Sequence, residues 1–219
     1  MAAAPFDPDF EALPAELPVF PLPGVLLLPR GRLPLNIFEP RYLAMTRAAL
    51  AGPRLIGMIQ PAEEERPGAP PPRLRPLGCA GRMVSFSETE DGRYLIVLKG
   101  LIRFAVAAEL EMVDGYRRVV PDFAPFRADL EPDRGAIDRP RLLAALKAYF
   151  TAQGIGADWA AVESAEDERL VTSLAMICPF GAGEKQALLE APDLAARGRM
   201  MVSLLEMAAF DSGPPSSLH

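Results

Sequence analysis

The sequence predicts an α+β protein in which a β-rich part is followed by a helical part. From residue 17 to about residue 126, short apolar stretches are separated by Pro and Gly, which is typical of strands. After about residue 130 the apolar spacing changes from two to 3.6, which indicates amphipathic helices. We therefore expect an N-terminal arm over 1–16, a β-rich subdomain over 17–128, a helical bundle over 129–210 and a disordered tail over 211–219.

Eight apolar stretches are expected to be strands: 17–22, 25–28, 33–38, 54–60, 79–87, 94–99, 102–106 and 116–120. In the third, Leu33, Leu35 and Ile37 alternate with less apolar residues, so one face of the strand can be buried. Pro34 in the same stretch favours an edge position or a bulge, because proline has no N–H for a neighbouring strand. Asp91-Gly92 predicts a tight hairpin, since glycine readily adopts the positive φ that such a turn demands.

One helix and one loop interrupt the strands. Glu39-Pro40 precedes an expected helix over 41–50, where proline fits the first turn and Tyr42, Met45 and Ala49 share one stripe. The segment 61–77 contains three consecutive glutamates and three consecutive prolines, so it predicts a projecting, mobile loop.

Four amphipathic helices are expected in the second part. The four helices are expected over 138–152, 166–178, 184–190 and 193–210, and the third of them is short. The apolar faces of the other three are Leu142, Leu143, Leu146 and Phe150; Leu170, Val171, Leu174 and Ile177; and Leu194, Met201, Leu205 and Ala208. Asp138 is a candidate N-cap and Gly154 a candidate stop for the first of them. Short links between such helices predict a small bundle.

The charge balance and the composition exclude several functions. Lys and Arg number 23 against 29 Asp and Glu, a net charge of −6, which argues against a nucleic-acid partner. Neither a signal peptide nor a run of about 20 apolar residues is visible, so we expect a cytoplasmic protein with no membrane partner.

No catalytic, metal or cofactor motif is found. The lysines are Lys99, Lys147 and Lys185, and none follows a glycine as in a P-loop. Cys79 and Cys178 lie far apart and His219 is the only histidine, too few ligands for zinc, so buried thiols are expected. These absences favour an interaction module over an enzyme, with no cofactor and no metal.

Two runs of residues closely resemble a known family. Leu17-Pro-Val-Phe-Pro-Leu-Pro-Gly-Val-Leu-Leu-Leu-Pro29, followed by Leu33-Pro-Leu-Asn-Ile-Phe-Glu-Pro-Arg-Tyr42, resembles the opening of the LON substrate-binding domain, the N-terminal domain of the ATP-dependent, bacterial-type Lon protease (peptidase S16). Leu77-Gly78, the segment 92–104, the segment 184–190 and the last helix resemble later parts, so the resemblance covers about 17–210. Asn36 stands where the family often has histidine, which puts the subgroup in doubt.

The resemblance implies a PUA-like mixed β-barrel followed by a C-terminal helical bundle. It also implies a non-catalytic module that binds unfolded or extended polypeptide segments, without ATPase and protease modules, and with a Lon-type protease as a candidate partner. Candidate peptide contacts are Phe38, Arg41, Tyr42 and Arg103; Arg forms bidentate contacts and Tyr offers a rigid apolar surface.

Alternatives remain open at this point. Phe38 and Phe104 could be core residues, with Arg41 a structural ion-pair partner. The chain could instead be an oligomerisation or regulatory/adaptor unit whose apolar surface meets a second copy or a protease partner. A small-molecule enzyme or sensor ranks third, and a deep pocket with convergent polar groups would favour it.

Overall fold

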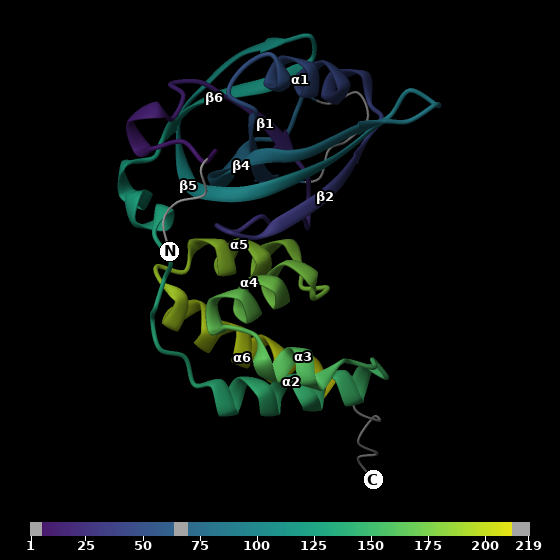
Figure 1. Ribbon diagram of the computed structural model, residues 1–219, viewed down its shortest axis with the longest axis vertical. Helices are drawn as coiled ribbons and strands as arrows, with labels where there is room; N and C mark the ends of the chain where they lie inside the picture. The colour runs from purple at the N-terminus through teal and green to yellow at the C-terminus, as the bar shows by residue number, and fades with distance from the viewer. Residues whose placement is uncertain (1–5, 64–69, 212–219) are drawn as a thin grey trace. The chain divides into compact units, whose positions relative to one another are not determined.

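The computed structural model describes residues 6–63 and 70–211 and divides the chain into two compact units, with the boundary between Pro132 and Asp133 (Figure 1). The first unit contains the strands and one α-helix, and the second contains helices alone among the residues described. The predicted α+β class is confirmed.

Six strands form the sheet in the described part of the first unit. They are β1 (Leu17–Pro21), β2 (Arg32–Ile37), β3 (Leu55–Pro61), β4 (Leu74–Glu88), β5 (Tyr94–Val113) and β6 (Tyr116–Asp122), in the order β2-β5-β4-β3-β1-β6. Only β1 and β3 are parallel. Because β5 also pairs with β6, the strands β5, β4, β3, β1 and β6 form a continuous ring of pairs. Helix α1 (Pro40–Leu50) and the 3-10 helices η1 (Phe10–Ala12) and η2 (Ala124–Leu130) complete the unit.

The alternating pattern predicted for 33–38 is confirmed in β2. The odd-numbered residues are more buried than their neighbours, and β2 pairs with β5 alone among the described strands, so Pro34 lies in an edge strand. The predicted hairpin is also confirmed, with Glu88 opposite Tyr94 and a φ of +80° at Gly92.

Three of the strand and loop expectations are wrong. The stretches 94–99 and 102–106 form one strand, because a bulge at Leu101 takes up the extra residue between the pairs Ala80–Ile102 and Gly81–Gly100. Residues 25–28 form no strand but an irregular buried segment. The expected loop 61–77 is shorter, because its last residues, from Leu74 onward, belong to β4; residues 64–69 of this loop lie outside the described part of the chain.

Residues 25–28 pass so close to β5 that position 100 of β5 must be glycine. A Cβ added to Gly100 would lie 2.0 Å from the carbonyl oxygen of Leu28. The Gly100 carbonyl accepts a hydrogen bond from the Arg30 amide at 2.8 Å, and the Gly100 amide donates to the Gly31 carbonyl at 2.9 Å. These two bonds hold Arg30 and Gly31, just after the segment, against β5 without strand pairing.

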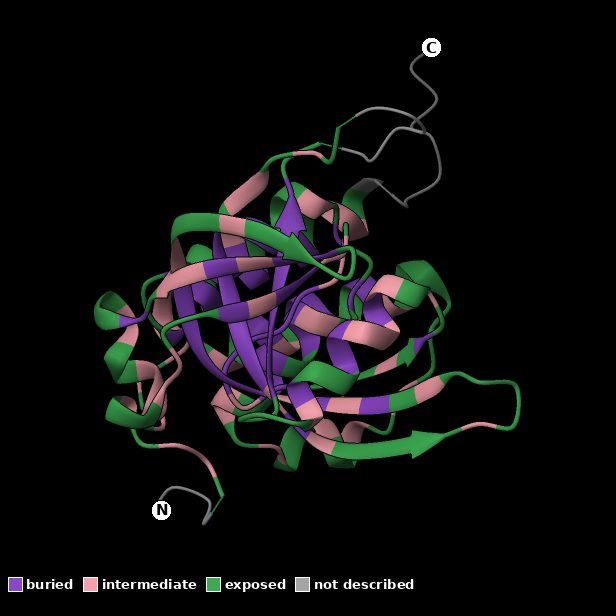
Figure 2. Ribbon diagram, turned by 90° about the horizontal axis from the view of Figure 1, so that it is seen from above, coloured by how far each residue is buried: buried purple, intermediate pink, exposed green. Residues whose placement is uncertain are grey.

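The core of the first unit lies between the strands, where buried residues concentrate (Figure 2). Its centre includes Leu17, Val19, Ile102, Val119 and the fully buried Phe104, whose ring packs edge-on 6.2 Å from Phe123. Phe104 is thus a core residue, as one alternative expected.

Five α-helices form the described part of the second unit: α2 (Arg139–Gln153), α3 (Trp159–Ser164), α4 (Asp167–Ile177), α5 (Ala182–Glu190) and α6 (Leu194–Asp211). The predicted caps of α2 are confirmed, because the Asp138 side chain accepts from the Arg141 amide and Gly154 is left-handed at φ +64°. Helix α3 was not expected, since its six residues are too few to show a period. Ile177, predicted to be on the buried face of α4, is 79% exposed, because it lies at the helix end.

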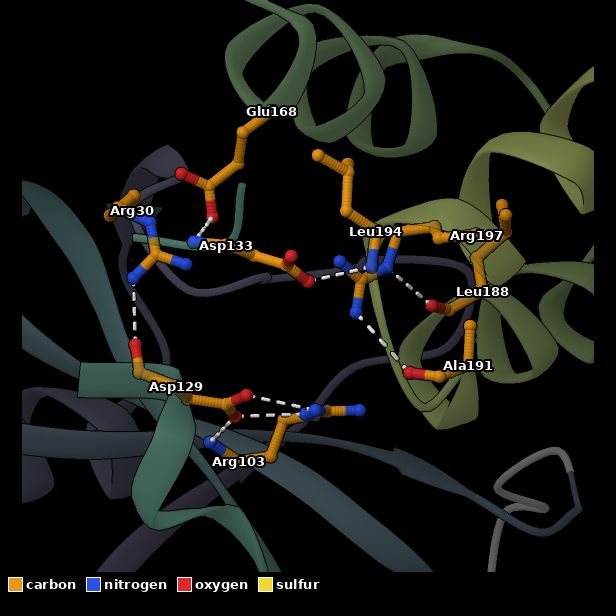
Figure 3. A network of polar contacts seen from close by, with 9 residues as sticks. All are labelled: Arg30, Arg103, Asp129, Asp133, Glu168, Leu188, Ala191, Leu194 and Arg197. Carbon is orange, nitrogen blue, oxygen red and sulfur yellow. Dashed lines mark hydrogen bonds and ion pairs between the residues drawn. The ribbon is translucent and has the colours of Figure 1, made fainter. Parts of the chain in front are cut away.

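Two polar groups organise the start of α6 (Figure 3). The Asp133 carboxylate accepts hydrogen bonds from the Leu194 amide at 2.7 Å and the Gly135 amide at 2.8 Å. The buried Arg197 guanidinium donates to the Leu188 carbonyl at 2.9 Å, which ties α6 to α5. Residues 212–219 of the expected tail lie outside the described part.

Candidate functional site

The first unit contains a pocket of about 360 Å³ that brings together four segments of the chain. We call it the proline pocket, because five of its lining residues are prolines. It is lined by Pro21, Leu22 and Pro23 after β1; Glu39, Arg41 and Tyr42 at the start of α1; Pro61, Pro71 and Pro72 at the ends of the β3–β4 loop; and Met112, Gly115, Tyr116 and Arg117 around the β5–β6 turn. Its volume lies at the lower end of the range of about 300–1,000 Å³ found for ligand pockets.

Helix α1 places Arg41 and Tyr42 in the wall of this pocket. Pro40 starts the helix and the stripe of Tyr42, Met45 and Ala49 faces the core, as predicted, so the first turn is held firmly. The Tyr42 ring lies 4.1 Å from the ring of Phe20. The Arg41 guanidinium lies 4.7 Å from the centre of the Tyr42 ring, and its Nε donates to Glu39 Oε2 at 3.0 Å. The pocket wall here is therefore an apolar ring covered by a half-exposed ion pair.

The β5–β6 turn supplies the opposing wall. Gly115 has a φ of +79°, and a Cβ added there would lie 3.3 Å from the Arg41 Cβ, so glycine lets the turn approach α1 closely. Met112, just before the turn, is 55% exposed and forms an apolar rim.

Arg117 fixes the proline-rich segment to the sheet. Its Nε and Nη2 donate to the two carboxylate oxygens of Glu109 at 2.6 and 2.7 Å, and its Nη1 donates to the Pro72 carbonyl at 2.7 Å. Arg117 is only 8% exposed whereas the Glu109 side chain is 41% exposed, so the guanidinium side of this bidentate pair is shielded from water, and Arg117 positions Pro71 and Pro72 at the pocket edge.

Tyr116 adds a hydroxyl to the polar groups of the pocket lining. The Tyr116 hydroxyl has no hydrogen-bond partner among the described residues. The fully buried side-chain atoms that lack a partner there are Arg75 Nε and Arg118 Nε, so the Tyr116 hydroxyl is not one of them. The Tyr116 side chain is buried, with 6% of the residue exposed, and it lines the pocket. A phenolic hydroxyl can both donate and accept a hydrogen bond.

The other two predicted contact residues lie elsewhere. Phe38 does not line the pocket; it is 60% exposed on the surface after β2, with the Arg93 guanidinium 5.9 Å from its ring, so it is not a core residue. Arg103 is buried on β5 and is held by Asp129, whose carboxylate accepts from Arg103 Nε and Nη2, each at 2.8 Å (Figure 3). The structure therefore brings together Arg41 and Tyr42 but separates Phe38 and Arg103 from them.

Tyr116 and Met112 were not among the predicted contacts. A signal was present, because an apolar pair, Met112-Val113, stands directly before an Asp-Gly turn, where exposed residues are expected. Pro61, Pro71 and Pro72 belong to the loop already singled out by its composition.

Two of the titratable groups with shifted pKa values, Cys178 and Lys185, lie in the helical unit. Burial raises the pKa of the Cys178 thiol to about 11, and it lowers the pKa of Lys185, whose Nζ donates to the Met176 carbonyl at 3.3 Å. A protonated thiol is a weak nucleophile, so Cys178 is a packing residue. Cys79 is also a buried thiol outside any disulfide, as expected. Within 6–63 and 70–211, no three His, Cys, Asp or Glu side chains gather in a way that could hold a metal ion.

Comparisons with known proteins identify the family. The family model for the ATP-dependent protease La (LON) substrate-binding domain matches residues 16–207. A Lon protease of Anaeromyxobacter dehalogenans and Lon protease 2 of Myxococcus xanthus are each 28% identical over 200 residues, 89% of this chain. The chain spans about a quarter of the length of these relatives, 23% and 24% respectively.

Solved structures show the same fold. The Lon N-terminal domain protein from Xanthomonas campestris aligns with a TM-score of 0.57 at 23% identity, over 86% of this chain and 97% of that one. The N-terminal domain of the Mycobacterium avium complex Lon protease aligns with a TM-score of 0.59 at 16% identity, over 87% and 97%. None of the helices described here has the length and apolar character needed to cross a bilayer.

Proposed function

This chain belongs to the LON substrate-binding domain family, and from that premise we propose that its β-rich unit binds extended segments of unfolded polypeptides at the proline pocket. The family supports a substrate-recognition module. The observation that carries the proposal is the combination, in one pocket, of apolar walls and a tyrosine, Tyr116, whose hydroxyl has no hydrogen-bond partner among the described residues.

The pocket suits one apolar side chain of an extended segment and one main-chain polar group beside it. Met112, Tyr42 and the prolines offer apolar contact, whose burial is the main source of affinity. The Tyr116 hydroxyl can pair with a peptide carbonyl or amide next to that side chain. Since every peptide bond carries these groups, such a pocket recognises apolar segments with little dependence on the rest of the sequence.

The four predicted contacts take different roles in this proposal. Arg41 contacts the bound segment directly at the pocket wall, while Tyr42 forms the floor against Phe20. Phe38 extends the surface for a longer segment, because it is exposed just before α1. Arg103 acts only by holding β5 and η2 together through Asp129.

The proposal includes further properties that the family suggests. The ring of paired strands supports a PUA-like barrel, and the unit boundary at Pro132 supports a β-rich part over 17–128 followed by a bundle over 129–210. The module itself is non-catalytic and acts in the cytoplasm on protein clients. A Lon-type protease is its partner for passing on those clients.

Binding of a carboxymethylated, permanently unfolded polypeptide tests the proposal. Replacing Met112→Asp places a charge at the apolar rim, and we expect affinity to fall at least about tenfold, because that methionine no longer buries apolar area. Tyr116→Phe removes only the hydroxyl, and we expect a loss of about three- to tenfold, the worth of one hydrogen bond.

Matched controls are available outside the pocket. Met207→Asp changes a methionine of similar exposure, 53%, on α6, and Tyr94→Phe removes a hydroxyl on the β4–β5 hairpin. Both controls should bind like the unchanged chain. Equal affinity of the pocket variants and their controls, with intact circular dichroism spectra, would reject the pocket as the binding site.

A further inference from the structure

Three basic residues lie side by side across three neighbouring strands of the first unit, β2, β5 and β4. In the strand register, Lys99 of β5 stands opposite Arg32 of β2 on one side and opposite Arg82 of β4 on the other. Directly opposite residues of antiparallel strands place their side chains on the same face, about 4.5–5.5 Å apart. Like charges in this position are destabilising, so the row, which we call the basic ladder, needs an anion.

The chain supplies one anion from its own N-terminal segment. Asp7 Oδ1 accepts from Arg82 Nε at 2.9 Å, and Asp7 Oδ2 accepts from Lys99 Nζ at 2.5 Å. The Asp7 side chain is 12% exposed, against 17% for Arg82 and 23% for Lys99, so the three groups are largely shielded from water. This is a built carboxylate site, with each oxygen bound by a different cation.

One carboxylate does not neutralise the ladder. Arg32 is exposed and has neither an ion pair nor a hydrogen bond with any residue described. Asp7 therefore pairs with two of the three cations, and Arg32 has no partner among the described residues.

The segment that carries Asp7 crosses the surface as a bound peptide would. Phe6 borders a cavity of about 530 Å³ next to Arg82 but stays 79% exposed, so it leaves that cavity largely open. Four residues after Phe6, Phe10 packs against the core cluster, with the Arg127 guanidinium 4.4 Å above its ring. The pattern is an aromatic residue, an acid, two further residues and a second aromatic residue.

We propose that the basic ladder is a second polypeptide-binding site, specific for an acidic residue next to an aromatic one, and that residues 6–13 of this chain occupy it as a tethered competitor. The site takes a carboxylate of a client segment in the position of Asp7, and the aromatic neighbour of that residue fills the cavity that Phe6 leaves open. Because a tether of this kind acts at an effective concentration near millimolar, only segments that bind better than the chain's own arm displace it.

This site lies apart from the proline pocket, but its role in recognising clients rests on the proposed function. In the full-length Asp7→Lys variant, Arg82 and Lys99 repel the introduced ammonium. The N-terminal segment therefore no longer occupies the basic ladder. The probe is a fluorescently labelled synthetic peptide with the sequence of residues 6–13, measured by anisotropy. We expect it to bind the Asp7→Lys variant at least about tenfold more tightly than the unchanged chain, because the competitor has been removed.

Peptide variants test the chemistry. A peptide with Asn in place of Asp7 should bind the Asp7→Lys variant at least tenfold more weakly, whereas replacing Asp9 by Asn should change nothing, because the Asp9 side chain caps no helix and pairs with no described group. Adding Lys99→Met to the Asp7→Lys variant should abolish binding.

Two results would overturn the proposal: no gain in affinity on Asp7→Lys, or equal binding of the Asp7 and Asn peptides. Adding the pocket change Met112→Asp to the Asp7→Lys variant separates the two sites. If this double variant binds the peptide as tightly as the Asp7→Lys variant does, the basic ladder binds independently of the proline pocket, even if the pocket binds no polypeptide. If the double variant no longer binds the peptide, the proposal of a separate site is contradicted.

Discussion

The buried pair of Arg103 and Asp129 permits a sharp test of what holds the β-rich unit together. The Asp129 carboxylate accepts three hydrogen bonds from Arg103, from the main-chain amide at 3.0 Å and from two guanidinium nitrogens at 2.8 Å. The two side chains are only 7% and 11% exposed. Asp129→Ala therefore leaves a desolvated guanidinium and a main-chain amide without their carboxylate.

Breaking a buried pair in this way costs about 3–5 kcal/mol. We expect the lower end, because the Arg103 guanidinium also lies 5.1 Å from the Phe126 ring and keeps that contact. A loss of about 3 kcal/mol corresponds to a hundredfold or greater fall in the protection of β5 amides against hydrogen exchange. Asp129→Asn keeps one acceptor oxygen and should cost about half as much.

Hydrogen exchange measured by mass spectrometry separates the two units. Trp159, the single tryptophan, lies in α3, so its fluorescence during urea unfolding reports on the helical unit and should not change. Glu11→Ala breaks an exposed pair with Arg127 and serves as the control, with β5 protection unchanged. A fall of less than tenfold in β5 protection on Asp129→Ala would refute the structural role assigned to Arg103.

Three further outcomes are expected. Phe104→Ala should destabilise the β-rich unit by about 3–5 kcal/mol in urea unfolding, because a fully buried ring is lost; a cost below 1 kcal/mol would place Phe104 outside the core. Asp138→Ala should destabilise the helical unit by about 0.5–2 kcal/mol, seen as an earlier Trp159 transition, since the Arg141 amide loses its cap; an unchanged midpoint would contradict this. Burial raises the pKa of Cys178 in the folded protein to about 11, so as pH rises the thiol ionises in the unfolded chain before it ionises in the folded one. The contribution of this thiol to the free energy of unfolding is therefore fully present below the ordinary thiol pKa and is lost as pH rises toward 11. Cys178→Ala should flatten that decline in unfolding measured from pH 8 to 11, and an identical decline in both proteins would count against the assignment.

The sequence correctly predicted those helices, strands and turns that are determined by residues within the element itself. The alternation in 33–38 identified an edge strand, Asp91-Gly92 identified a hairpin, and Asp138 with Gly154 bounded a helix. These signals come from backbone conformation and from the face that a short segment buries, so they need no knowledge of distant partners.

The expectations that failed depended on distant contacts. Leu26, Leu27 and Leu28 are as apolar as a strand, yet the backbone just after them, at Arg30 and Gly31, bonds to Gly100, some 70 residues away. Arg103 resembles a binding residue in the sequence, but its partner Asp129 is 26 residues away. Of the four single residues predicted as contacts, only Arg41 and Tyr42 line the pocket, because the pocket is assembled from four segments that are separated along the chain.

The most direct test of polypeptide binding at the proline pocket is a methyl NMR titration of the chain labelled at its methionine methyl groups. Met112 lies at the pocket rim, and Met207 on α6 is similarly exposed but remote in sequence. On addition of an unfolded polypeptide, we predict that the Met112 methyl resonance shifts and saturates while the Met207 resonance stays in place. A saturating titration in which Met112 does not move would contradict the account.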